Sequence, residues 1–87
     1  MKKIIITGGS GFIGSNLVSY FLKKNYFVIN IDKLSYSANK YNLNIMNKKN
    51  YVFIKSDINN KKIILKTLNR FQPSIIFNLA AETHVDR

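Results

Sequence analysis

The sequence predicts an α/β fold built on a doubly wound parallel sheet, of which this chain supplies an N-terminal part in the order β-α-β-β-α-β. Three observations predict it. Short β-branched apolar runs alternate with amphipathic helical patterns, which is typical of a parallel sheet with right-handed crossovers. A glycine-rich turn joins the first run to the first helix, and Asp32 ends the second run. The 87 residues, 46% of them hydrophobic, suffice for one small domain with a core.

Four strands are predicted from the apolar runs. The run 4–6 consists only of isoleucine and is bounded by Gly8 and Gly9, as expected of a strand buried on both faces. Runs of the same kind cover residues 27–31, ending at Asp32, residues 51–54, ending near Asp57, and residues 74–79. The fourth strand leaves apolar sheet surface that would require further neighbours.

Two helices are predicted from apolar residues at helical spacing. The first runs over about 11–24, with its inner face formed by Ile13, Leu17, Val18, Phe21 and Leu22. The second starts at a cap supplied by Asn59 or Asn60 and ends near Phe71, before Pro73. Its predicted inner face comprises Ile64, Leu65, Leu68 and Phe71. A short helix is also predicted at about 38–46, within a polar, Asn-rich stretch.

Composition excludes several classes of function. The net charge is +10, but the lysines are scattered over predicted loops and helix ends, which indicates a solvated surface and no nucleic-acid partner. Without cysteine there is no disulfide or thiol chemistry, and no residue set is proposed as metal ligands. The first apolar run stops at Gly8 and is too short for a signal peptide or a membrane span. A cytoplasmic protein with no membrane partner is expected.

The turn between the first strand and the first helix has glycines at positions 8, 11 and 14. In a Rossmann-type βαβ unit Gly8 would allow the tight turn, Gly11 would let the backbone approach a pyrophosphate, and Gly14 would let the helix pack on the strand. The free N–H groups at the start of the helix would then face the phosphates.

Asp32 lies 18 residues beyond Gly14, close to the spacing expected of a carboxylate that binds the adenosine ribose. A carboxylate there repels a 2′-phosphate, so NAD is predicted as the cofactor in preference to NADP, a preference that the adjacent Lys33 weakens. Asp57 follows the third strand, where an adenine would lie, and an equally good interpretation is that it caps the next helix.

Three stretches resemble the dTDP-glucose 4,6-dehydratases, extended short-chain dehydrogenases/reductases of the NAD-dependent epimerase/dehydratase family. Residues 7–14 (TGGSGFIG) match the family's TGxxGxxG turn, residues 32–36 (DKLSY) resemble its DKLTY segment, and residues 79–87 (LAAETHVDR) resemble its AAESHVDRS segment. The resemblance spans the whole chain. It implies that residues 1–87 are the N-terminal part of an NAD-binding Rossmann domain, about a quarter of such an enzyme.

The resemblance also implies which residues surround the cofactor. Around the pyrophosphate and ribose they are Gly8, Gly11, Phe12, Ile13, Gly14, Asp32, Lys33, Leu34 and Ser35. Near adenine they are Asp57 and Ile58, and toward the nicotinamide Leu79, Ala80, Ala81, Glu82 and Thr83. Thr83 would in addition touch the nucleotide-sugar substrate. The alternative to a cofactor role for Leu79, Ala80 and Ala81 is ordinary packing of small residues at a strand end.

The activity implied by the resemblance is that of a lyase, which dehydrates dTDP-glucose to dTDP-4-keto-6-deoxyglucose in deoxysugar biosynthesis and works as a homodimer. The catalytic residues and substrate domain of the family lie beyond Arg87, so the 87-residue chain is expected to be inactive alone. Tyr-x-x-x-Lys spacing occurs at Tyr20, Tyr36 and Tyr51, but none of these positions suits the catalytic pair. For His84, a structural or substrate-edge role is favoured over catalysis.

Three other functions compete with this interpretation. A nucleotide-sugar epimerase or decarboxylase of the same superfamily would share the fold and cofactor and differ downstream. A non-catalytic NAD-binding or redox-sensing module would bind the dinucleotide without a sugar-nucleotide site. A basic nucleic-acid binder would show salt-dependent binding to arbitrary DNA, although no recognition motif supports it.

Overall fold

The computed structural model describes residues 1–8, 12–33 and 49–79 of the chain. Its elements follow the predicted order and are β1 (Lys3–Thr7), α1 (Phe12–Lys23), β2 (Phe27–Asp32), β3 (Tyr51–Lys55), α3 (Lys61–Phe71) and β4 (Ile75–Asn78). The four predicted strands and the two longer predicted helices are thereby confirmed. The short helix predicted at 38–46 lies outside the described residues.

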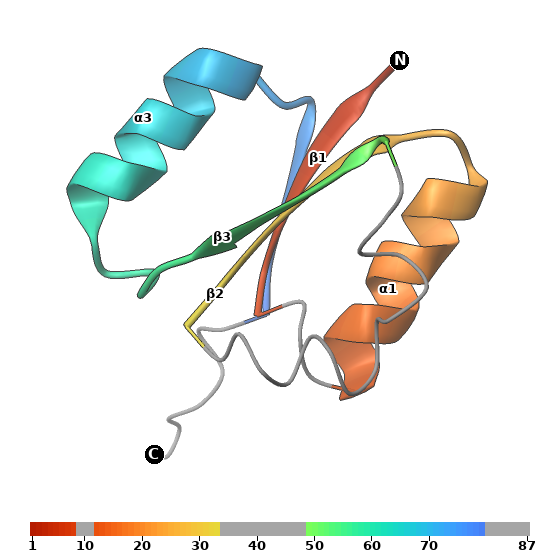
Figure 1. Cartoon of the computed structure of the whole chain (residues 1–87), viewed down its shortest axis with the longest axis horizontal. Helices are drawn as coiled ribbons and strands as arrows, with labels where there is room; N and C mark the ends of the chain where they lie inside the picture. Colours follow the sequence, from red (N-terminus) through yellow and green to blue (C-terminus); the bar gives the residue numbers. More distant parts are fainter. Residues whose placement is uncertain (9–11, 34–48, 80–87) are drawn as a thin grey trace.

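The four strands form one parallel sheet in the order β3-β2-β1-β4. The chain therefore moves outward from β1 to β2 and β3, then crosses back to place β4 on the other side of β1. Figure 1 shows α1 and α3 on opposite faces of this sheet, as a doubly wound fold requires. The reversal of strand order between β1 and β4 is a topological switch point, where open α/β sheets bind ligands at the carboxyl ends of their strands.

The core consists of one apolar cluster on each face of the sheet. Successive side chains of a strand point to opposite faces, so the isoleucines of β1 divide between the two clusters. Beneath α1 the buried members are Ile4, Ile6, Val18, Leu22, Val28 and Tyr51. Beneath α3 they are Ile5, Ile29, Ile31 and Phe71. The continuous apolar run of β1 predicts a strand buried on both faces, and β1 is buried on both faces.

Two predicted core residues are exposed. Leu65 is 61% exposed, because the face of α3 that meets the sheet follows the spacing of Ile64, Thr67 and Phe71, and Leu65 lies about 100° away from Ile64 around the helix. Ile13 is 73% exposed, because it lies about 140° around α1 from Val18, away from the face on which Gly14, Val18 and Leu22 are buried. Assignment of both residues to the inner faces was wrong.

The sheet ends on β4, which is only partly covered. Ile76 is 54% exposed and Phe77 is 38% exposed, although both belong to an apolar strand. Among the described strands β4 pairs only with β1, through a register that places Ile76 beside Ile5. The predicted apolar surface at the end of the sheet is therefore present.

Helix α1 ends in a Schellman motif centred on Asn25. Asn25 has a φ of 65°, its N–H donates to the Leu22 carbonyl (3.0 Å), and the Tyr26 N–H donates to the Phe21 carbonyl (3.0 Å). The rings of Phe21 and Tyr26 meet edge-on with centroids 4.9 Å apart, which is the apolar contact that accompanies this motif. The motif turns the chain into β2.

Replacing Asn25 with Gly is expected to stabilise the fold by about 0.5–1 kcal/mol, because glycine adopts a positive φ without the steric cost of a Cβ atom. Urea denaturation followed by circular dichroism measures the change. The matched control is Asn25→Ala, which should destabilise the chain by about 1 kcal/mol. A Gly variant no more stable than the Ala variant would show that the positive φ is not maintained in solution.

Helix α3 is capped at both ends. The Asn60 side-chain oxygen accepts a hydrogen bond from the Ile63 N–H (3.2 Å), so the cap is the second of the two predicted candidates. At the other end Gln72 adopts a left-handed conformation, and its N–H donates to the Leu68 carbonyl (2.9 Å). Pro73 follows, as predicted for the end of the helix.

Candidate functional site

The first glycine of the turn lies beside the end of β2. Gly8 has a φ of 79°, a region that a side chain would make costly. Its N–H donates to the Ile31 carbonyl (2.8 Å), one residue before Asp32. This hydrogen bond brings the start of the glycine turn and the Asp32 backbone to the same carboxyl edge of the sheet.

The third glycine, Gly14, is buried in the first turns of α1, beside the buried Ser15. A larger residue at Gly14 would push the helix from the sheet, so the packing role predicted for this glycine agrees with its burial. The first N–H groups of α1 have no partner within the helix itself and lie at the carboxyl edge of β1. Gly11 lies outside the described residues, and of Phe12 only the helical backbone is described.

Asp32 is the last residue of β2 and is half-buried. Its carbonyl accepts a hydrogen bond from the Ser56 N–H (3.1 Å), and in the sheet register it faces Lys55 of β3. The β2–β3 ladder therefore extends to the last residue of β2 and fixes the position of Asp32 at the edge. Lys33 is exposed beside it, while Leu34 and Ser35 lie outside the described residues.

Asp57 has a definite role in the turn between β3 and α3. One carboxylate oxygen accepts a hydrogen bond from the Asn59 N–H (2.9 Å), and the Asp57 carbonyl accepts one from the Asn60 N–H (3.0 Å). This is an Asx turn that leads into the Asn60 cap. Asp57 is thus the turn residue before α3, whereas the cap of that helix is Asn60. A contact with adenine, by Asp57 or by the half-buried Ile58, remains a prediction.

A polar contact at the switch point was missed by sequence reasoning. The Thr7 hydroxyl, buried at 3% exposure, donates to the Asn78 side-chain oxygen (2.6 Å) and so connects the carboxyl ends of β1 and β4. The Leu79 N–H donates to the Thr7 carbonyl (3.0 Å), which places half-buried Leu79 at the same edge. The available signal was that Thr7 and Asn78 each end an apolar strand. Ala80, Ala81, Glu82 and Thr83 lie outside the described residues.

A second polar contact lies within the core on the α1 side. Asn30 is completely buried in β2, and its side-chain N–H donates to the Tyr51 hydroxyl (3.1 Å). Burial raises the pKa of the Tyr51 phenol, the Asn30 hydrogen bond lowers it, and the negative charge of Asp32 raises it. The net shift is upward. The signal in the sequence was a lone amide side chain inside an otherwise apolar strand.

This shift predicts a loss of stability in alkali. In the unfolded chain Tyr51 ionises near pH 10, whereas the folded chain holds the proton to higher pH. The contribution of Tyr51 to the free energy of unfolding is therefore complete below about pH 10. It is lost as the pH rises through the raised pKa, and the free energy of unfolding then falls by up to about 1.4 kcal/mol per pH unit. Urea denaturation from about pH 9 to pH 11 should show less of this fall in Tyr51→Phe than in the matched exposed variant Tyr20→Phe. An equal fall in both variants would contradict the burial of the Tyr51 phenol.

The described site residues thus converge on one edge. Gly8, Asp32, Asp57 and Leu79 all lie at or just beyond the carboxyl ends of parallel strands. A glycine without a Cβ, the amides of a helix start and a half-buried carboxylate match the groups that bind a diphosphate and a ribose. Within residues 1–8, 12–33 and 49–79 no cluster of acidic or histidine side chains is arranged to hold a metal ion. In the same ranges neither helix is long and apolar enough to cross a membrane.

Comparison with known proteins identifies the family. A family model described as GDP-mannose 4,6 dehydratase matches residues 5–87. The dTDP-glucose 4,6-dehydratase of Haemophilus influenzae is 48% identical over 89 residues, which cover 100% of this chain and 26% of that enzyme. The dTDP-glucose 4,6-dehydratase of Salmonella typhimurium is 44% identical, over 98% of this chain and 24% of that enzyme.

Solved structures agree with these relatives. The crystal structure of the Bacillus anthracis dTDP-glucose 4,6-dehydratase in complex with NAD has a TM-score of 0.86 and 37% identity, over 95% of this chain and 28% of that one. The UDP-glucose 4-epimerase of Thermotoga maritima, determined with UDP-glucose, has a TM-score of 0.74 and 30% identity, over 93% of this chain and 25% of that one. The chain thus spans about a quarter of the length of the proteins that it matches.

The comparisons confirm the resemblance carried by residues 7–14, 32–36 and 79–87, and they confirm the Rossmann-type parallel sheet. The relatives with the higher identities are dehydratases, and the epimerase shares the fold at lower identity. Since the family model covers all but the first four residues, the chain belongs to the GDP-mannose 4,6 dehydratase family.

Proposed function

We propose that this chain is the N-terminal part of the NAD-binding domain of a dTDP-glucose 4,6-dehydratase, and that NAD binds at the carboxyl edge of its sheet. The observation that carries the proposal is the hydrogen bond from the Gly8 N–H to the Ile31 carbonyl. It sets Gly8, the start of the glycine turn, beside the end of β2, so one dinucleotide can meet both the helix amides and the Asp32 carboxylate. The 48% identity with a dehydratase over the whole chain supports the choice of enzyme.

Each part of the edge has a proposed role in holding NAD. The amides at the start of α1 face the pyrophosphate, with Gly8 allowing the tight turn, Gly11 the close approach of the backbone and Gly14 the packing of the helix on the sheet. Asp32 accepts hydrogen bonds from the adenosine ribose hydroxyls and repels a 2′-phosphate. The remaining proposed contacts are those of Phe12, Ile13, Lys33, Leu34 and Ser35 around the pyrophosphate and ribose, Asp57 and Ile58 at adenine, and residues 79–83 toward the nicotinamide.

The bound NAD supplies hydride acceptance and return, and the complete protein supplies the acid and base groups that eliminate water from the sugar. This chain's own part is to bind and orient the cofactor, with Thr83 also proposed to touch the nucleotide sugar. The nucleotide-sugar substrate proposed for the complete protein is dTDP-glucose. A cytoplasmic homodimer is proposed for it, which light scattering and cell fractionation would test.

Isothermal titration calorimetry of the complete protein with NAD and NADP tests the cofactor, and we expect tighter binding of NAD. Incubation with dTDP-glucose and with UDP-glucose tests the reaction, since a dehydratase yields a 4-keto-6-deoxy product from the first and an epimerase converts the second. Heat from NAD without turnover of any nucleotide sugar would favour a non-catalytic NAD-binding module. Absence of NAD binding would overturn the proposal altogether.

A further inference from the structure

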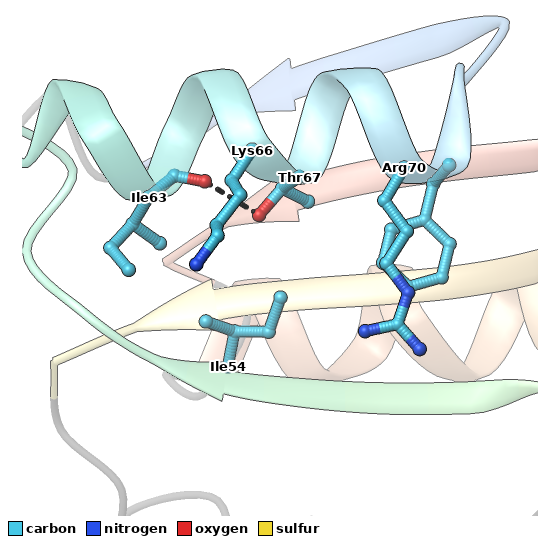
Figure 2. A pocket seen from close by; sticks show the side chains of 6 residues that line it. Ile54, Ile63, Lys66, Thr67 and Arg70 are labelled. Atoms are coloured by element: carbon cyan, nitrogen blue, oxygen red, sulfur yellow. Dashed lines mark hydrogen bonds between the residues drawn. The ribbon is translucent and has the colours of Figure 1, made fainter.

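A groove lies between α3 and the edge strand β3, on the face of the sheet opposite α1 (Figure 2). Its volume is about 150 Å³, enough for one benzene-sized group. It is lined by Ile54, Ile63, Lys66, Thr67, Arg70 and Phe71. None of these residues belongs to the edge that is proposed to bind NAD, so the groove is a separate feature.

The groove combines an apolar floor with two cations. Ile54, Ile63 and Phe71 supply the apolar surface, and Figure 2 shows Lys66 and Arg70 extending from α3 toward β3. The two cations are one helical turn apart, about 6 Å along the axis. The Arg70 guanidinium lies 5.0 Å from the centroid of the Phe71 ring, which holds its charge at the rim.

The Thr67 hydroxyl is already occupied, since it donates to the Ile63 carbonyl (2.8 Å). The side-chain donors that the groove offers a ligand are therefore the two cations. A ligand that matches the groove has one apolar group of side-chain size, with a negatively charged group on each side of that apolar group.

The edge of β3 beside the groove is open among the described strands, where β3 pairs with β2 alone. The Val28 N–H donates to the Asn50 carbonyl and the Ser56 N–H donates to the Asp32 carbonyl, so the even-numbered residues of this segment face β2. In a parallel ladder alternate residues face the same neighbour. The backbone groups of Tyr51, Phe53 and Lys55 therefore point outward, where an added strand would pair with them.

A second copy of this chain is a poor occupant. The chain has 14 Lys and Arg against 4 Asp and Glu, so a copy would bring mostly positive charge to Lys66 and Arg70. Attraction across the groove requires negatively charged groups, and an occupant that also pairs with the open edge of β3 must be a peptide, whose negative groups are carboxylates. Charge complementarity thus selects an acidic partner.

We propose that this groove binds an extended acidic peptide segment of a partner protein. The segment adds to the outer edge of β3, inserts one apolar side chain between Ile54 and Phe71, and places carboxylates against Lys66 and Arg70. Side chains two residues apart on a strand share a face, so the pattern Glu-x-Phe-x-Glu presents the anchor and both acids to the groove.

The probe is a synthetic peptide of sequence Glu-Thr-Phe-Thr-Glu, acetylated and amidated, titrated into the ¹⁵N-labelled protein and followed by NMR. We expect saturable shifts of the Tyr51, Phe53 and Lys55 amides and of residues in α3. A peptide with Ala in place of Phe should bind about tenfold more weakly or worse, because the buried apolar anchor is lost. A peptide with Lys in place of both Glu residues should not bind.

The double variant Lys66→Glu, Arg70→Glu should bind the acidic peptide about tenfold more weakly. The matched control is Lys61→Glu, Lys62→Glu, which makes the same charge change on exposed residues of α3 outside the groove. If the double Glu variant loses its thermal transition, Lys66→Gln, Arg70→Gln replaces it. Absence of peptide binding, equal loss in both charge-reversed variants, or shifts confined to other surfaces would each overturn the proposal.

Discussion

Replacing Ile6 with Ala is expected to lower the free energy of unfolding by about 3–5 kcal/mol. Ile6 lies in β1, where it registers with Asn30 of β2 on one side and with Phe77 of β4 on the other, and it is completely buried beneath α1. Loss of its side chain leaves a cavity that neighbouring strands are too constrained to fill. A domain of this size has about 5–10 kcal/mol of stability in total, so the substitution removes about a third of it or more.

The matched control for this prediction is Ile13→Ala, the same chemical change at a position that is 73% exposed. It should change the free energy of unfolding by less than about 0.5 kcal/mol, because little apolar surface is uncovered and alanine favours the helix. Urea denaturation of the two variants measures the difference directly. Similar losses at both positions would show that Ile13 is buried in solution and that the described packing of α1 is wrong.

Replacing Asp32 with Ala is expected to weaken NAD binding by about 10- to 100-fold. Asp32 is half-buried at the end of β2, where the ladder to β3 fixes its backbone and Gly8 lies beside the preceding residue. Removing the carboxylate would leave the ribose hydroxyls without a charged hydrogen-bond acceptor. Isothermal titration calorimetry on the complete protein measures the effect.

Binding of NADP provides the internal control for Asp32. The carboxylate should repel a 2′-phosphate, and the exposed Lys33 beside it would attract one, so NADP binding should be unchanged or stronger in Asp32→Ala. The ratio of the two affinities then separates a lost ribose contact from general damage to the site. Equal weakening of both dinucleotides would contradict the role assigned to Asp32.

The parts of the fold that the sequence predicts well are those written in local patterns. The isoleucine run of β1, the glycine turn and the Asn60 cap each depend on neighbouring residues, so their spacing is readable along the chain. Asp32 could be placed at the edge for the same reason, because a carboxylate that ends a buried parallel strand must lie at its carboxyl end.

The parts that could not be predicted depend on which elements meet in space. The Thr7–Asn78 hydrogen bond joins residues 71 positions apart and exists only because β4 crosses back to lie beside β1. Asn30 likewise finds Tyr51 across a ladder whose register depends on the whole sheet. On α3 Thr67 is buried against the sheet and Leu65 is exposed, although leucine is the more hydrophobic of the two residues. In each case tertiary geometry decided between locally equivalent choices.

In a preparation of residues 1–87 alone, the uncovered edge of β4 makes the colloidal behaviour depend on salt. Ile76 and Phe77 form an exposed apolar strand edge through which identical molecules can associate, while a net charge of +10 repels those molecules from one another. Added salt shortens the range of this repulsion to about 8 Å at physiological ionic strength and leaves the apolar attraction between the strand edges unchanged. Clear dilute solutions at low ionic strength should therefore turn turbid as salt is added.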